Sequence, residues 1–167
     1  MFRYMDDFMN AYSSLVDGTT KMMAKLTDQN IHQKVAEGQR ELGHIAWHIA
    51  VTVPEMMNQT GLGISGLDPK APPPNTAAEI QAGYASVNQA LISALEDKWN
   101  DDILEEVDEM YGEQWPRGLT LAILVDHEVH HRGQMSVLLR QAGERVPGIY
   151  GPAREEWEQY GMETPPY

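Results

Sequence analysis

The sequence predicts an all-α protein: a four-helix bundle with a long crossover loop between its second and third helices and an arm after the fourth. Four segments carry apolar residues at spacings of three and four, the period of a helix that buries one face. No segment shows the alternation typical of a half-buried strand, so we expect no sheet. At 167 residues, the chain is long enough for one domain and short for two. We therefore expect one domain over residues 1–167, with the bundle at about 4–142 and the arm at 143–167.

The first two helices are predicted from long apolar stripes. The first is expected from about Tyr4 to Leu26, and the second from about Gly38 to Gln59. The stripe of the second helix consists of Leu42, Ile45, Ile49, Val53 and Met56. Each stripe lies on one side of its helix, so both helices are expected to pack on a shared core.

The third helix has a clear start signal. Thr76 and Glu79 stand at the spacing of a capping box, and the apolar period continues from there to about Leu95. The preceding loop, GLGISGLDPKAPPPN at residues 61–75, is long enough to cross the end of a bundle. The following segment, residues 99–116, is too long for a simple turn and has room for a short helix.

The fourth helix is expected from about Arg117 to Ala142, because Gly143 is a natural C-terminal cap. The arm beyond it contains several prolines together with Tyr150, Trp157 and other aromatic residues. Such an arm packs on the bundle, packs on a partner subunit or is a loose end, and its aromatic side chains favour packing.

Composition excludes several classes of partner. Twelve Lys and Arg against 25 Asp and Glu give a formal net charge of -13, which repels nucleic acid and anionic membrane surfaces. No apolar run approaches the roughly 20 residues of a membrane span, and Asp6 and Asp7 interrupt the N-terminus where a signal peptide needs an apolar core. We expect a cytoplasmic protein. Without cysteine, a metal must be held by His and carboxylates, and thiol chemistry needs an external thiol.

The fourth helix contains HEVHH at residues 127–131, which matches the H-E-x-x-H pattern of zinc proteases. His127 and His131 are four residues apart and therefore share one helix face. The mean direction of the apolar residues of this helix falls between them, so both imidazoles are expected to point into the bundle. By the same geometry, Glu128 and His130 are expected to border the core on opposite flanks.

Two buried imidazoles need polar partners. A metal ion satisfies both, and hydrogen bonds to Gln134, Tyr84 or a carbonyl are the alternative. A third metal ligand must come from another helix, where His48 lies closer to the apolar stripe than His44 does. We therefore expect a metal site of His48, His127 and His131.

The protease and di-iron interpretations are disfavoured by what the rest of the chain lacks. A zinc protease normally aligns its substrate along an edge strand, and no strand is expected here. Di-iron bundles carry E-x-x-H in two helices, as at Glu41–His44 and Glu128–His131, but they need a carboxylate from each of the other two helices. The first helix has no Glu, and the third has it only at its ends. A mononuclear site of neutral ligands is the simplest assembly.

The segments RELGHIAWHIAVTVPEMM and HEVHHRGQMSVLLRQAGERVPGIYGP resemble the DinB family of the DinB/YfiT-like four-helix bundles. The resemblance implies an up-up-down-down bundle, a homodimer, and one divalent metal ion, nickel or zinc, bound by His48, His127 and His131. His44 departs from the related pattern, where an acidic or other non-ligating residue is expected. It is therefore a candidate for a second hydrogen bond to the site or for an alternative ligand.

Three neutral imidazoles leave an open position on a metal ion, where a bound thiol would be deprotonated. Some DinB-like proteins are thiol-dependent transferases, so the resemblance implies an S-transferase that activates an exogenous low-molecular-weight thiol toward a small-molecule substrate. The alternatives are a non-catalytic, metal-stabilised binding module and a metal-dependent hydrolase with Glu128 as base. Gln134 is a candidate for orienting a ligand, and Arg132 is expected to pair with an acidic neighbour. Gly133 is expected to allow close approach of a helix or the arm.

Overall fold

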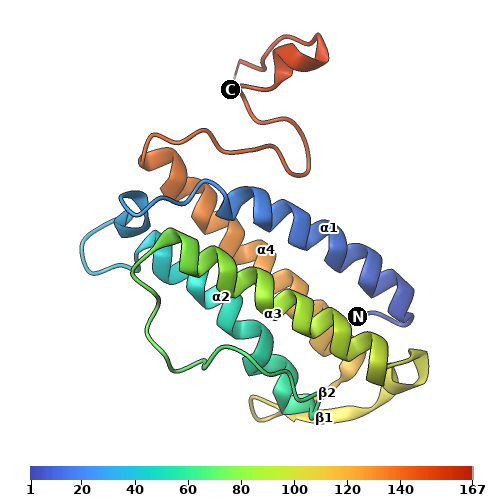
Figure 1. Ribbon diagram of the computed structural model, residues 1–167. Helices are drawn as coiled ribbons and strands as arrows, with labels where there is room; N and C mark the ends of the chain where they lie inside the picture. Colours follow the sequence, from blue (N-terminus) through green and yellow to red (C-terminus); the bar gives the residue numbers. More distant parts are fainter. Residues whose placement is uncertain (167) are drawn as a thin grey trace.

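The computed structural model describes residues 1–166 and contains the expected four-helix bundle (Figure 1). The helices are α1 (Met5–Met23), α2 (Leu42–Met57), α3 (Ala77–Lys98) and α4 (Arg117–Gln141). Each lies within the expected segment to within a few residues at either end. None of them combines the length and the apolar character that a membrane crossing requires.

Two helices run in one direction and two in the other. The Phe2 N–H donates to the carbonyl of Gly118 at 3.0 Å near the start of both α1 and α4, so these two helices are parallel. The Lys98 ammonium donates to the carbonyl of Leu62 just beyond the end of α2, so α2 and α3 are parallel as well. In chain order the directions are up, down, down, up, which differs from the expected order. The segment between α1 and α2 reverses the chain, whereas residues 61–76 run back along the bundle and start α3 at the same end as α2 (Figure 1).

The start of α3 and the end of α4 follow the expected signals. The Thr76 hydroxyl accepts from the Glu79 N–H at 3.3 Å, which caps the helix, and it donates to the Glu79 carboxylate. After α4, Gly143 has φ +86°, a conformation that favours glycine.

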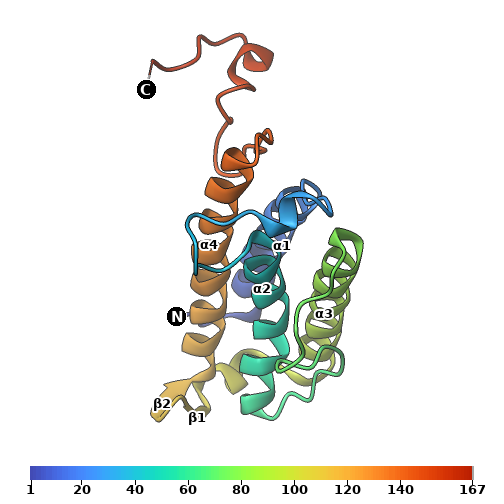
Figure 2. The ribbon, with the colours of Figure 1, turned by 90° about the vertical axis from the view of Figure 1, so that its left-hand side faces the viewer.

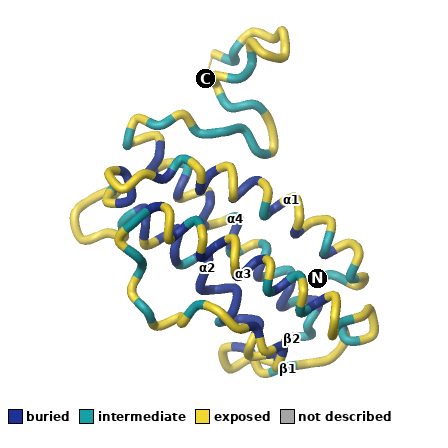
Figure 3. Tube along the Cα trace, viewed as in Figure 1, coloured by how far each residue is buried: buried dark blue, intermediate teal, exposed yellow. Residues whose placement is uncertain are grey.

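The central helix of the bundle is α2, which lies between α3 and α4 (Figure 2). Thirteen of its sixteen residues are buried, and dark burial along this helix marks the core in Figure 3. The three exceptions are His44, His48 and Glu55. An imidazole at position 48 is therefore placed where the core meets the surface.

A β-hairpin corrects the expectation that the chain has no strands. β1 (Val107–Met110) pairs antiparallel with β2 (Glu113–Pro116). Tyr111 and Gly112 form the two-residue turn with φ of 53° and 85°, the positive values that a type I′ turn needs. The strands have four residues each and only Met110 is buried, so no apolar alternation marks them. The short helix anticipated in this connection is present as the 3-10 segment η3 (Asp101–Glu105).

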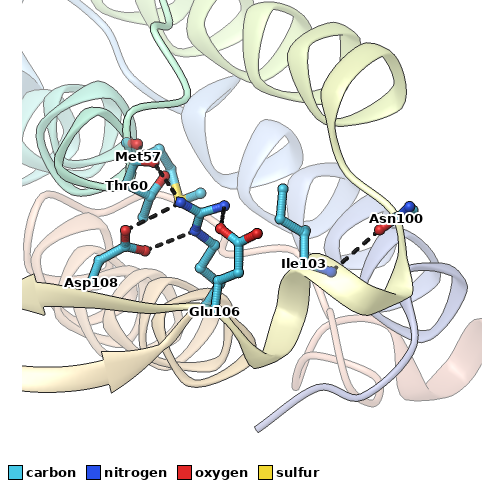
Figure 4. Close-up of polar contacts among 7 residues, drawn as sticks. Met57, Thr60, Asn100, Ile103, Glu106 and Asp108 are labelled. Atoms are coloured by element: carbon cyan, nitrogen blue, oxygen red, sulfur yellow. Dashed lines mark hydrogen bonds and ion pairs between the residues drawn. The ribbon is translucent and has the colours of Figure 1, made fainter.

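One arginine ties the hairpin to the bundle. Arg117, the first residue of α4, donates from Nε to Asp108 Oδ2 at 2.8 Å and forms an ion pair with Glu106 Oε2 at 2.7 Å. Its Nη2 also donates to the carbonyl of Thr60, just past the end of α2, at 3.2 Å. Figure 4 shows Asp108, Glu106 and Thr60 facing the same guanidinium. This cluster joins the start of α4 to the end of α2, the two helices that carry the candidate ligands.

The first part of the arm packs on the bundle, and Glu155 farther along pairs with Arg140 of α4. Ile149 lies against Gly18 of α1, where an added Cβ would come within 2.7 Å of the isoleucine side chain. Arg132 Nη2 donates to the Tyr150 hydroxyl at 2.7 Å. Farther along, the arm leaves the bundle and carries a short 3-10 turn, η4 (Trp157–Tyr160), away from it (Figures 1 and 2).

Candidate metal centre

Three histidines meet where α2 and α4 lie side by side. His48 comes from the second turn of α2, and His127 and His131 come from successive turns of α4. One ring nitrogen from each lies within 4.8 Å of the others, and this is the one group of potential metal ligands found among residues 1–166. The expected ligand set is therefore brought together in space.

The spacing of the three rings fits a metal ion. His48 Nε2 and His127 Nε2 are 3.2 Å apart. Two ligands about 2.05 Å from a tetrahedral ion are separated by about 3.3 Å. The ring centroids are 4.4–4.9 Å apart and the rings meet edge to face, so they converge on a point instead of stacking.

The surroundings keep all three imidazoles neutral. Partial burial, followed by the neighbouring His131, lowers the pKa of His48 to about 4. Burial and then the other histidines lower the pKa of His127 to about 4, and burial lowers the pKa of His131 as well. A neutral imidazole has the free lone pair that a metal requires, so proton competition at pH 7 is weak.

Gln134 fixes the orientation of His131. Its carbonyl Oε1 accepts from His131 Nδ1 at 2.8 Å, so Nδ1 carries the proton and Nε2 keeps its lone pair. The Gln134 amide in turn donates to His130 Nε2 at 3.1 Å. Gln134 therefore lies beside the three-histidine group, and its role in orienting a metal ligand stays a prediction.

The remaining histidines lie outside the group. His44 is exposed, with its Nδ1 3.8 Å from Glu41 Oε2, and His32 Nδ1 lies 3.0 Å from the same carboxylate oxygen. His130 is exposed and interacts with Gln134. The structure does not place His44 as a ligand of the three-histidine group.

Glu128 lies in the core, which corrects the expectation that it borders it. Its side chain is 2% exposed, and its Oε1 accepts from the Tyr84 hydroxyl of α3 at 2.6 Å. Its Oε2 has no hydrogen-bond partner within the described part of the chain. Burial raises the pKa of this carboxyl group above its usual value. Glu128 therefore faces the interior and is not part of the ligand group.

Two neighbouring expectations on α4 are also wrong. Arg132 is 3% exposed and donates to the carbonyl of Leu15 at 3.1 Å and to Thr19 Oγ1 at 3.2 Å, so it has neutral partners and not an acidic one. Gly133 is exposed, and nothing lies within 4 Å of the position of an added Cβ. Gly133 therefore does not serve to let a helix or the arm approach α4 closely.

A cavity of about 410 Å³ adjoins the site. It includes His131 and Gln134 from α4, together with Gln39 and Arg40 from the loop before α2. Its apolar lining consists of Val35, Ile45, Val137 and Leu138. The sequence pattern did not point to the loop residues, because no helical period or ligand spacing marks them.

Similarity to known proteins extends over nearly the whole chain. The model of the DinB family matches residues 1–164. YrdA of Bacillus subtilis (strain 168), an uncharacterized protein, is 39% identical over 165 residues, which are 99% of both chains. The crystal structure of a DinB-like protein from Bacillus cereus ATCC 10987 is 38% identical with a TM-score of 0.87, covering 90% of this chain and 100% of that one. A second DinB-like structure, YjoA of Bacillus subtilis, is 17% identical with a TM-score of 0.69 over 88% and 99% of the two chains, and it shares the fold.

Proposed function

The chain belongs to the DinB family, and from this premise we propose that it binds one divalent metal ion through His48, His127 and His131. The observation that carries the proposal is the convergence of three neutral ring nitrogens within 4.8 Å of one another. Without a metal ion, three partly buried imidazoles would face each other with few polar partners, which is unfavourable. An ion of the nickel or zinc type satisfies all three, since both accept imidazole nitrogen.

We further propose that the site serves a thiol-dependent transfer reaction. Three protein ligands leave at least one coordination position open, and a bound divalent ion lowers the pKa of a thiol so that it is present as thiolate. The chain has no cysteine, so the thiol must be a separate small molecule. In such a transfer the sulfur forms a bond to an electrophilic carbon, the leaving group departs with its electron pair, and the thiol proton passes to water.

The roles of the protein side chains follow from their contacts. Gln134 holds the His131 ring in the orientation that directs Nε2 toward the other two histidines. The cavity beside His131 supplies an apolar wall for an organic ligand. No role as general base is proposed for Glu128, because it is buried against Tyr84.

Metal content tests the first proposal. Protein purified without an affinity tag should contain about one divalent ion per chain, and His127→Ala should lose it. His44→Ala is the matched control, since this histidine lies on the same α2 but outside the group. Equal metal content in His127→Ala and wild type, or a wild type that takes up no nickel or zinc, would rule out this site.

Conjugation of monochlorobimane to a panel of small thiols tests the transfer reaction. The metal-loaded protein should accelerate conjugation with at least one thiol, and His127→Ala should not. If the loaded protein accelerates none of them, the transferase proposal fails while metal binding stands.

A second candidate is a binding module in which the ion only stabilises the fold. It is favoured by the position of the ligands, since His48 and His127 join α2 to α4 across 79 residues of chain. In that case, chelation should lower the melting temperature strongly, because ligand binding to the folded state stabilises it. No small thiol should then compete for the open position.

A further inference from the structure

Arg40 lies on the wall of the cavity beside His131, and its side chain has no partner among the described residues. It lies two residues before the start of α2 and lines the cavity together with Gln39. Its guanidinium forms no ion pair and no side-chain hydrogen bond with any residue in the range 1–166. By contrast, Arg117 and Arg140 each pair with carboxylates, and Arg132 donates to neutral oxygen atoms. The donors of Arg40 are therefore available to a ligand in the cavity that this residue lines.

The charge of Arg40 lies close to the three-histidine group, because Arg40 lines the same cavity as His131. A divalent ion held by the histidines would be repelled by this charge. The arrangement becomes favourable when an anion lies between the two positive centres.

The cavity lined by Arg40 and His131 has the size and lining for an organic ligand. Its volume of about 410 Å³ lies at the lower part of the range for small-molecule sites, roughly 300–1,000 Å³. Apolar side chains such as Ile45 and Leu138 would contact a hydrocarbon body. The polar groups come from two elements, Gln134 and His131 from α4 and Arg40 and Gln39 from the loop.

We propose that Arg40 is a specificity-determining residue that selects ligands carrying a carboxylate, so that the cavity binds a small organic anion with an apolar body. The planar fork of the guanidinium can donate two parallel hydrogen bonds to a carboxylate. The inference rests on the proposed metal site, and it adds the class of ligand that the site takes. Gln39 supplies a further amide beside the same cavity.

A pair of six-carbon thiols that differ only in their terminal group tests the proposal. 6-Mercaptohexanoate and 6-mercaptohexan-1-ol carry the same sulfur and the same chain, and only the first has a carboxylate. Titration calorimetry on the zinc-loaded protein should give an affinity about tenfold higher for the acid, the size expected for a hydrogen-bonded charge pair. The preference should shrink as salt is added.

Variants of one loop separate Arg40 from general charge effects. Arg40→Gln should abolish the preference for the acid and leave the affinity for the alcohol unchanged. Lys34→Gln is the matched control, because it removes one positive charge from the same loop at a residue that pairs with Glu41 and does not line the cavity. It should retain the preference.

The outcomes distinguish the two proposals. Equal affinity for both thiols, absence of binding by either, or an equal loss of preference in the two variants would overturn the role of Arg40 while leaving metal binding intact. If the protein takes up no metal, hexanoate and hexan-1-ol are compared on the metal-free protein. An Arg40-dependent preference for hexanoate would then support the inference although the metal site had failed, and its absence would overturn both.

Discussion

The three candidate ligands make the stability of the metal-free protein depend on pH. Their pKa values are lowered from 6.5, to about 4 for His48 and His127, chiefly by burial. Between these values the unfolded chain binds protons that the folded chain does not, so unfolding is favoured as pH falls. We expect the free energy of unfolding to decrease from about pH 6.5 to about pH 4, and to be insensitive to these groups above pH 7.

Comparison with His127→Asn isolates this contribution from other titrating groups. Urea unfolding of the metal-free proteins at several pH values should show a shallower decrease for the variant, because one of the shifted groups is gone. If the free energy of unfolding fell equally steeply with pH in both proteins, the pKa of His127 would not be lowered by folding.

The sequence predicted the positions of the three histidines correctly, because spacing along a helix determines which face a residue lies on. His127 and His131 share a face because they are four residues apart, and His48 was selected by its position relative to an apolar stripe. The same averaging misplaced Glu128, which lies in the buried stripe of α4. The mean direction was calculated from apolar residues alone. When the buried face of a helix also contains polar residues, such a mean does not point to the centre of that face.

The role of Arg40 could not be predicted for a different reason. Whether an exposed arginine lies beside a cavity depends on how a loop folds back over a neighbouring helix. The path of this loop depends on tertiary contacts, and no local pattern in residues 33–41 predicts it.

At the level of elements, the Arg117 cluster should fix the hairpin against α2 and α4. The Arg117 side chain is 13% exposed and Asp108 is 17% exposed, so their hydrogen bonds are shielded from water. Arg117→Met should lower the free energy of unfolding by about 2 kcal/mol, the range for hydrogen bonds to charged groups. Arg117→Lys should recover only part of it, because an ammonium cannot make the paired contact with Asp108. Urea unfolding measures both.

Arg140→Met is the control for this prediction. Arg140 also pairs with a carboxylate, that of Glu155, but on an exposed surface where such pairs contribute little. If the Arg117 and Arg140 variants lose the same stability, the Arg117 cluster does not anchor the hairpin.

Helix extents were predictable, whereas the hairpin and the order of helix directions were not. Apolar period and end signals such as Thr76 and Gly143 are local, and the helices follow them. β1 and β2 are short and largely exposed, so they carry no apolar alternation. Helix direction depends on the path of the connecting loops, which the composition of residues 61–75 does not specify.

For the molecule as a whole, the two parts of the arm should differ in their effect on stability. Truncation after Glu156 removes η4, which leaves the bundle and has no buried residue. It should change the free energy of unfolding by no more than about 0.5 kcal/mol. Ile149→Ala with Tyr150→Ala should cost more, because it removes the contact with Gly18 and a partner of the buried Arg132. Urea unfolding of both proteins checks this.

If truncation lowered the free energy of unfolding markedly and the double substitution hardly changed it, η4 and not the segment around Ile149 would be the part of the arm that stabilises the bundle. The sequence predicted a single bundle with an arm, but it did not indicate which part of the arm packs on the bundle. Its aromatic residues favoured packing throughout, yet only those near Ile149 lie against α1 and α4.

The distance along the chain between the ligands has a consequence for biosynthesis. His48 is made 79 residues before His127, and α3 and the hairpin are synthesised between them. A nascent chain that has completed α2 contains only one of the three candidate ligands, His48, and would bind a divalent ion weakly. Only when α4 has emerged and docked does the full set exist, so metal capture follows folding and does not nucleate it. Under the proposed metal site, uptake of the ion would therefore report that translation has passed the last helix and that α4 has packed against α2.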